Sequence, residues 1–187
     1  MPAQPHRALA RRQTRLGAVI ESPERHQIEA DFLTDDVGEL LSKHFAFSDT
    51  ASTLVVYEGC SMYFDEAQNL RILRSIRRRL RNPERRLWMD CVTPAVISSS
   101  TPDPNIHEFV NQMELIGEKF VYGPRDPVDF LRRCGFVCET DLTAGEFLNN
   151  PDATLGEYRF TVSRIEEIML DEELDAKLNG DADVVVG

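Results

Sequence analysis

Three carboxylates stand at or near the ends of short apolar runs in this sequence. Asp31 and Glu58 each come directly after such a run, and Asp90 lies late in a third. If the runs are strands of a parallel sheet, their carboxyl ends meet at one edge, where open α/β sheets bind ligands. A carboxylate there accepts hydrogen bonds from an amine or a ribose hydroxyl, and an apolar neighbour such as Phe32 can cover an adenine ring. These positions therefore predict an edge that binds a nucleoside.

Each carboxylate also has a purely structural interpretation, because acidic residues often end strands as turn formers or helix caps. We favour that interpretation for Asp90, and spacing alone leaves Asp31 open between the two. The functional interpretation of Glu58 gains support from the residues that follow it. Gly59 lets the backbone approach a ligand closely, and Tyr63 stands just before a helix that Asp65 can cap.

The elements that must position these residues alternate along the chain. Strand-like apolar runs occur at 26–31, 53–57, 86–92, 136–142 and 157–165, and helical patterns occur at 5–16, 37–45, 65–80, 105–120 and 126–134. The run 53–57 is typical of a strand buried on both faces, whereas 157–165 alternates like a strand with one face in water. This order predicts an α/β fold: a Rossmann-like, mostly parallel sheet with helices on both faces and an antiparallel edge strand.

The helix at 65–80 is the clearest of these patterns. Its apolar residues recur at spacings of three and four, and its arginines lie elsewhere on the cylinder: Arg71, Arg74, Arg78 and Arg81. A binding role for the arginine row is one interpretation. We favour the other, a solvated face paired with nearby acids, because no aromatic residues are interleaved with the arginines.

Composition and charge exclude several classes of function. With 42% hydrophobic and 28% charged residues, the chain has the composition of a folded globular domain. Its net charge of -11 disfavours nucleic-acid binding, which usually needs a net basic face. No run approaches the roughly 20 apolar residues that span a bilayer, so we expect no membrane association and a cytoplasmic location.

The four cysteines give no sign of a metal site. Cys60, Cys91, Cys134 and Cys138 form no Cys-x-x-Cys pair, and Cys134 and Cys138 have no histidine close by in sequence. We therefore expect buried free thiols and no bound metal.

Several segments resemble one family of enzymes. The sequence VVYEGCSMYF at 55–64 is similar to the EGvlmYl segment of the leucine carboxyl methyltransferase family. Downstream, MDCV at 89–92 resembles its fDyv pattern, and 123–136, with Asp126-Pro127 and Cys134-Gly135-Phe136, resembles its g-dp...fL...GF stretch. Upstream, Ala30-Asp31-Phe32 is similar to its vDl motif, and 11–16 to the helix after its second strand.

This resemblance implies a class I S-adenosylmethionine-dependent methyltransferase. Asp31 and Phe32 would contact the adenine end of the cofactor, Glu58 and Gly59 would lie near its methionine end, and Tyr63 would line the acceptor pocket as the catalytic candidate. The implied reaction is methyl transfer to a carboxylate or hydroxyl oxygen of a small molecule, with no metal. Such a transfer proceeds in line, so the enzyme mainly positions the reactants and excludes water.

The sequence departs from the family before Pro5. The family's first strand ends in a glycine-rich turn and its second in an acid that binds ribose, yet Gly17 is the only glycine before Gly38. We expect a partial methyltransferase domain at 1–165, without the first two strands of the family fold, and a flexible acidic tail at 166–187. Unpaired sheet edges must be covered, so the chain rearranges, a second or complementing chain completes the sheet, or the reading frame is shortened and has little activity.

Two alternatives accompany the methyltransferase hypothesis. One is a noncatalytic remnant that dimerises, or binds a partner, through an exposed sheet edge. The weaker one is a nucleotide-binding reductase, which the sequence disfavours because no Gly-x-Gly-x-x-Gly follows a strand.

Overall fold

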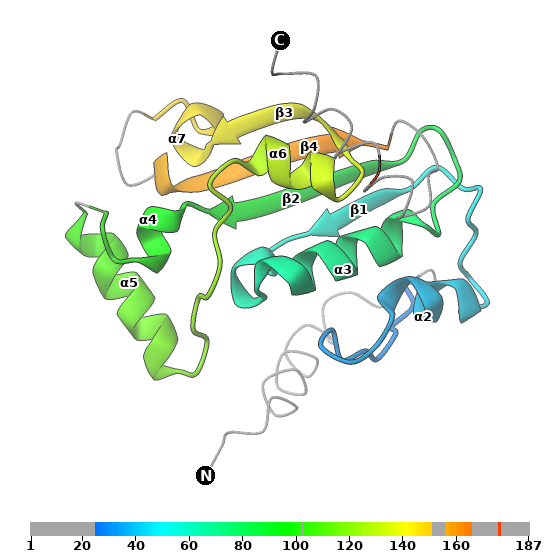
Figure 1. The fold of residues 1–187 in the computed structure, drawn as a ribbon, viewed down its shortest axis with the longest axis horizontal. Helices are drawn as coiled ribbons and strands as arrows, with labels where there is room; N and C mark the ends of the chain where they lie inside the picture. The colour runs from blue at the N-terminus through cyan, green and yellow to red at the C-terminus, as the bar shows by residue number, and fades with distance from the viewer. Residues whose placement is uncertain (1–24, 102, 151–155, 166–175, 177–187) are drawn as a thin grey trace.

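The computed structural model of the protein describes residues 25–101, 103–150, 156–165 and 176 (Figure 1). Its elements are, in chain order, α2 (Val37–Lys43), β1 (Leu54–Tyr57), the 3-10 helix η1 (Ser61–Tyr63), α3 (Glu66–Arg77), β2 (Arg86–Val92), α4 (Pro94–Ile97), α5 (Pro104–Leu115), α6 (Pro127–Arg133), β3 (Val137–Thr143), α7 (Ala144–Phe147) and β4 (Tyr158–Arg164). The predicted helix at 5–16 and, apart from residue 176, the acidic segment 166–187 lie outside the described residues.

The strands form one sheet in the order β1-β2-β4-β3. β1 and β2 are parallel, with Leu54 opposite Arg86 and Tyr57 opposite Met89. β4 runs antiparallel to both of its neighbours, β2 and β3. The α/β class and the antiparallel edge that the sequence predicts are therefore confirmed.

The main core lies between the sheet and helices α3 and α6, which cover the front face of the sheet in Figure 1. Leu87, Met89 and Cys91 of β2 are fully buried on this face, against Leu73 of α3 and Leu131 of α6 among others. Helix α7 lies against the opposite face, where the ring of Phe147 is 5.4 Å from that of Phe160. Trp88 stacks on Phe160 on this second face.

Two of the predicted strands bury different faces from those expected. β1 is not buried on both faces, since Leu54 and Val56 are 61% and 55% exposed. The reason is its place at one edge of the described sheet, where only the α3 side is covered. In β4 the fully buried side chains are the polar Thr161 and Ser163. The register pairs them with Met89 and Leu87, so they face the helices, and Thr161 donates to the carbonyl of Met89 at 3.1 Å.

The predicted strand at 26–31 is wrong. Residues 25–31 have no regular secondary structure, and a turn follows at 32–34. An extended segment becomes a strand only where its N–H and C=O groups find a ladder partner. Among the described residues β1 pairs with β2 alone, so nothing brings 26–31 into the sheet.

Local signals set the helix ends as expected. Asp65 caps α3 in a capping box with Gln68, in which each side chain accepts from the other residue's main-chain N–H. α6 ends in a Schellman motif at Gly135, whose φ is 83°, with Phe136 donating to the carbonyl of Leu131 at 2.9 Å. Helix α4, which the sequence analysis missed, is a single turn that begins at Pro94.

The arginine row of α3 holds neighbouring segments in place. Arg78 and Arg81 pair with Asp36 and Asp49, which confirms the expected pairing with acids. Arg71 instead donates to the carbonyls of residues 32, 33 and 35, and Arg74 donates to that of Arg133. Much of the row thus ties turns and helix ends to α3.

Replacing Gly38 by alanine is expected to destabilise the protein by about 1–3 kcal/mol, the usual cost of overpacking a tight contact. A Cβ at Gly38 would lie 2.1 Å from the carbonyl oxygen of Ser75, so α2 would have to move off α3. It would also disturb the 2.7 Å hydrogen bond from Gly38 N–H to Ser75 Oγ. Urea unfolding measures the change. Gly156→Ala is the control, since nothing lies within 4 Å of its Cβ; equal effects of the two would contradict the packing argument.

Candidate functional site

The carboxyl ends of β1 and β2 form the edge at which the sequence predicts a ligand. The loop 58–65 follows β1 at this edge and contains η1, and α3 begins directly after it. Helices α4 and α5 lie beyond the carboxyl end of β2 (Figure 1). The edge therefore has the sheet on one side and the α4–α5 segment on the other.

Asp90 organises the main chain of this edge. Its side chain is 1% exposed and accepts from Gly59 N–H at 2.8 and 3.1 Å and from the Tyr158 hydroxyl. Its carbonyl accepts from Ser61 Oγ at 2.6 Å. Burial raises the pKa of the Asp90 carboxyl, against the lowering effect of the Tyr158 and Gly59 hydrogen bonds. These contacts agree with the structural interpretation of Asp90.

Asn69 holds the same loop from the side of α3. It is fully buried, its Oδ1 accepts from the Tyr57 hydroxyl at 3.0 Å, and its Nδ2 lies 2.8–3.0 Å from the carbonyls of Ser61, Phe64 and Asp65. Sequence reasoning missed this residue. The available signal was its position, since an asparagine three and four residues before Ile72 and Leu73 lies on the buried stripe of α3.

Glu58 and Gly59 are both exposed at the start of the loop. Gly59 has a φ of 61° and open space where a Cβ would stand, so its backbone is accessible to a ligand. The carbonyl of Glu58 accepts from Cys60 Sγ at 3.3 Å. Among the described residues, then, the Glu58 carboxylate is the exposed acidic acceptor at the end of β1.

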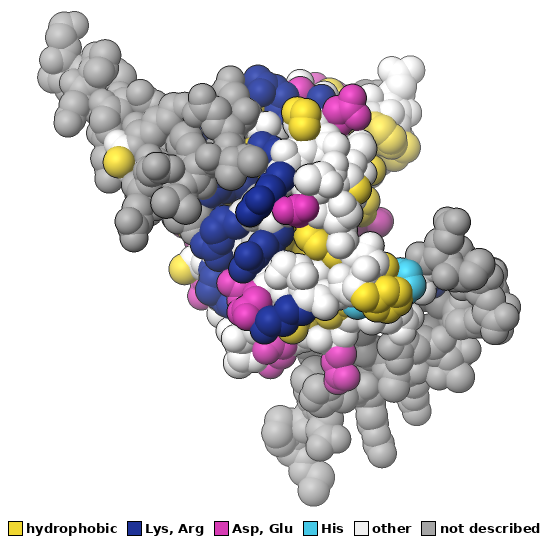
Figure 2. Space-filling model, turned by 90° about the vertical axis from the view of Figure 1, so that its right-hand side faces the viewer, with side chains coloured by type: hydrophobic (Ala, Val, Ile, Leu, Met, Phe, Trp, Pro, Cys, Tyr) yellow, Lys and Arg dark blue, Asp and Glu magenta, His cyan; other side chains and the backbone are white. Residues whose placement is uncertain are grey.

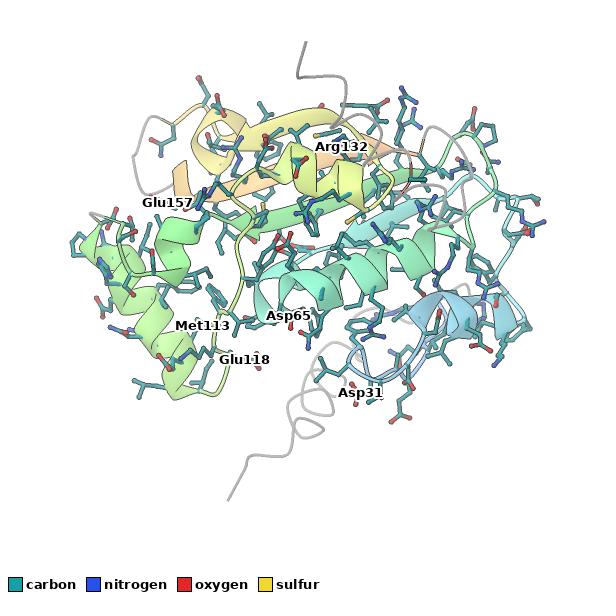
Figure 3. The ribbon with its side chains drawn as sticks, viewed as in Figure 1. Asp31, Asp65, Met113, Glu118, Arg132 and Glu157 are labelled. Carbon is teal, nitrogen blue, oxygen red and sulfur yellow. The ribbon has the colours of Figure 1, made fainter. Side chains whose placement is uncertain are left out.

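Asp31 and Phe32 reach this region by a turn rather than by a strand. Figure 3 labels Asp31 in the loop below α3, and Asp65 at the start of that helix. The Asp31 carboxylate accepts from Leu33 N–H at 2.8 Å, so it closes its own turn. Phe32 meets Phe64 edge to face at 5.8 Å. Phe32 thus joins the turn to the loop 58–65, whereas the Asp31 carboxylate is engaged locally.

Tyr63 faces the α4–α5 side. Its ring lies 5.2 Å from that of Phe120, edge to face, beside a small core of Met62, Val92 and Val96. Met113 of α5, labelled in Figure 3, also packs on this core. The carbonyl of Met62 accepts from Val121 N–H at 2.8 Å, which ties the loop after α5 to η1.

Neither thiols nor carboxylates form a metal centre in the part of the chain that the structure describes. Cys91 and Cys134 are buried free thiols, while Cys60 and Cys138 are half-buried. Burial raises the pKa of the Cys91 thiol to about 12, so it remains protonated. Within the same residues, no helix has the length and apolar character needed to cross a membrane.

The residues at the edge fit one side of S-adenosylmethionine. The exposed carboxylate of Glu58 can accept from an amine or hydroxyl, and the open space at Gly59 allows close approach to the backbone. No glycine-rich turn follows a strand in the described residues, so they offer no nest of N–H groups for the carboxylate of the cofactor. The described edge therefore offers an exposed carboxylate and an accessible stretch of main chain.

Comparison with solved structures defines the class of fold. A DUF574 family protein from Streptomyces avermitilis matches with a TM-score of 0.57 and 14% identity, covering 81% of this chain and 60% of that one. A predicted methyltransferase from Thermobifida fusca matches with a TM-score of 0.57 and 13% identity (83% and 59% covered). The pyocyanin biosynthetic protein PhzM matches with a TM-score of 0.51 and 18% identity (82% and 38% covered). The chain spans 38–60% of the length of these proteins. The fold is that of class I S-adenosylmethionine-dependent methyltransferases.

The sequence profile of the family described as leucine carboxyl methyltransferase matches residues 6–77. A comparison with curated proteins finds no significant match. Over this range the chain is similar to that family, in agreement with the resemblance of its motifs. The matched range includes Asp31, Phe32, Glu58, Gly59 and Tyr63.

Proposed function

We propose that the protein transfers a methyl group from S-adenosylmethionine to a carboxylate or hydroxyl oxygen of a small molecule. The observation that carries this proposal is the edge at the end of β1, where an exposed carboxylate and an accessible glycine backbone stand on a loop fixed by buried Asp90 and Asn69. Preorganised groups of this kind position reactants at little cost in entropy. The methyltransferase fold and the family match support the same assignment.

Each residue has a defined part in this proposal. Glu58 accepts hydrogen bonds from the cofactor, and Gly59 brings the main chain against it. Phe32 covers the adenine, and Asp31 acts at the same end by holding the turn that carries Phe32. Tyr63 lines the acceptor side because it faces Phe120 and the α4–α5 segment. When bound, S-adenosylmethionine supplies an electrophilic methyl group, and these residues orient the acceptor oxygen and exclude water.

Calorimetric titration with S-adenosylmethionine tests the proposal. We expect specific micromolar binding that Glu58→Ala weakens by about 10- to 100-fold, because a hydrogen bond to a charged group contributes about 1.5–3 kcal/mol. Glu84→Ala is the matched control. Glu84 is also an exposed acid, and it lies just before β2, at the opposite end of that strand from the site. A folded chain that shows no heat of binding, or equal weakening by both variants, would refute the assignment.

A specific feature also favours the second candidate, a module that dimerises through its sheet. β1 is an edge of the described sheet, and its Leu54 and Val56 are 61% and 55% exposed. Exposed apolar edge strands readily pair with another chain. A second copy paired along β1 would cover this edge together with its exposed Leu54 and Val56.

Sedimentation velocity at micromolar concentration distinguishes this candidate. We expect a dimer that Val56→Lys converts to a monomer, since a charge on an edge strand opposes pairing. Val121→Lys is the control, because Val121 is 46% exposed but lies in the loop after α5. A monomeric wild-type chain would exclude this second function and leave the methyltransferase proposal untouched.

A further inference from the structure

Basic side chains are missing from the segments that build the edge after β1 and β2. Residues 44–70, which contain β1, η1 and the start of α3, include no lysine or arginine. Neither do residues 87–118, which contain most of β2 and the helices α4 and α5. Residues 71–86 contain eight arginines instead. Figure 2 faces the side at which α3 ends and β2 begins, and it shows Lys and Arg side chains gathered in a band there. Positive charge therefore gathers at the amino end of β2, away from the edge.

Two carboxylates set the charge of the edge itself. Glu58 is exposed at the end of β1, and Asp90 lies buried beside Gly59. Burial, together with the nearby carboxylates of Asp90 and Glu58, raises the pKa of the Cys60 thiol to about 11. Burial also raises the pKa of Tyr158, and its hydrogen bond to Asp90 and the charge of Glu58 add to the rise. A further negative charge placed at this edge would be repelled.

Two of the cations that follow these segments in the chain have acidic partners. Lys119 lies 3.1 Å from Glu114, and Arg133 of α6 pairs with Glu66 at the start of α3. These charges are therefore compensated within the protein. Arg125, in the loop before α6, is exposed and is a cation that an acceptor carboxylate could use, so it belongs in any test of the acceptor.

Aromatic rings flank the edge on the side of α5. The ring of Tyr63 lies 5.2 Å from that of Phe120, and the ring of Phe120 lies 6.1 Å from that of Phe109. Phe120 is buried, whereas Tyr63 is half-buried and Phe109 is 53% exposed. Tyr63 and Phe109 therefore offer apolar ring surface to a planar ligand, next to the loop that begins with Glu58.

We propose that the methyl acceptor of this protein is a neutral aromatic hydroxyl compound, a phenol, and not a carboxylate. The inference rests on the proposed function and selects one of its two acceptor classes. The ring of a phenol packs against Tyr63 and Phe109, and its uncharged hydroxyl avoids the repulsion by Glu58 that a carboxylate would meet.

Methyl transfer to a phenol balances without a further reactant. The bond between the methyl carbon and the sulfonium sulfur breaks, and its electron pair stays on the sulfur. The acceptor oxygen forms the new bond to the methyl carbon, and the hydroxyl proton leaves to water. The product is a neutral methyl ether.

Calorimetric binding of a matched ligand pair to the full chain tests this inference. The pair is 2-naphthol and 2-naphthoate; at about pH 7 the first is neutral and the second is anionic, since phenols titrate near pH 10 and carboxyls near pH 4. Naphthol should bind at least about tenfold more tightly than naphthoate, which corresponds to about 1.4 kcal/mol. Glu58→Gln should cut this preference to about threefold, because it removes the charge that repels naphthoate. Glu84→Gln, at the opposite end of β2, is the control and should leave the preference unchanged.

A second pair of variants tests the aromatic surface. Phe109→Ala should weaken the binding of naphthol about two- to tenfold, the range that an aromatic pair contributes. Leu115→Ala is the control, since Leu115 is 86% exposed at the end of the same helix but lies on a different side of it. Equal binding of naphthol by the two variants would contradict a site on these rings.

Several results would overturn the inference. They are a naphthoate that binds as tightly as naphthol, a chain that binds neither ligand, and naphthoate binding that Arg125→Gln specifically weakens, because Arg125 would then hold an acceptor carboxylate. Titration with S-adenosylmethionine separates these results from failure of the proposed function. A chain that binds the cofactor without preferring naphthol refutes only the acceptor class, whereas a chain that binds no cofactor refutes both.

Discussion

Replacing Asn69 by alanine is expected to lower the free energy of unfolding by about 4 kcal/mol, because a buried polar group left without its partner costs about 1–3 kcal/mol. The change would leave the Tyr57 hydroxyl without its acceptor and three loop carbonyls without their donor. It would also open a cavity at a fully buried position of α3. The loop 58–65 would lose its anchor, so binding of S-adenosylmethionine should weaken together with stability.

Urea unfolding measures the effect, and two further variants define its cause. Asn69→Asp keeps an acceptor for Tyr57 but places carboxylate oxygens against the carbonyls of Ser61 and Phe64, so it should be at least as damaging as alanine. Asn111→Ala, an exposed position on α5, should change stability by less than about 0.5 kcal/mol. A small loss with Asn69→Ala would show that water or the loop itself satisfies these groups.

The second large effect is expected at Asp90. Asp90→Ala should destabilise the protein by about 3 kcal/mol, because Gly59 N–H and the Tyr158 hydroxyl lose a common acceptor. Gly59 begins the loop that carries the site, so this variant should also bind the cofactor less tightly. Glu84→Ala is again the control, since an exposed acid in a loop contributes little to stability. An Asp90→Ala chain as stable as wild type would refute the role of Asp90 as an anchor.

The buried carboxyl of Asp90 also gives a defined pH dependence. Burial raises the pKa of the Asp90 carboxyl in the native state above the ordinary value of 3.8, which applies in the unfolded state. At a pH between 3.8 and the native pKa, the native state therefore holds a proton that the unfolded state has lost. Its contribution to stability is therefore complete below pH 3.8 and is lost as the pH rises through the native pKa. Unfolding of wild type and Asp90→Asn from about pH 4 upward should show the advantage of wild type shrinking. An advantage that grows with pH would contradict the raised pKa.

Sequence reasoning located most elements because their signals are local. The strand 86–92 agrees with β2 residue for residue, Asp65 caps α3, and Gly135 ends α6. The side chain of each cap and the αL glycine act within a few residues, so no distant contact is needed to recognise them. The same holds for Glu58 and Gly59, which follow their strand directly.

The errors concern residues whose state depends on distant partners. Residues 26–31 have the composition of a strand, yet a strand needs a neighbour, and β1 pairs with β2 alone among the described residues. Thr161 and Ser163 point inward because the register of β4 with β2 puts them opposite Met89 and Leu87. The alternation of Phe160 and Val162 shows that the strand has two different faces, but the pairing decides which face the helices cover.

The amino-acid sequence by itself determined the α/β class, the four strands β1 to β4, the helices α2, α3, α5 and α6, the methyltransferase resemblance and the placement of Glu58 and Gly59 after a strand. Only the tertiary structure decided that Asn69 and Asp90 anchor their loop, that Asp31 closes a turn, and that β1 is an edge of the described sheet. The physical reason is the distance along the chain over which each interaction acts. Caps, turns and periodicity are set by neighbours in sequence, whereas burial and hydrogen bonding across 12 to 31 residues of chain require the elements to be packed together.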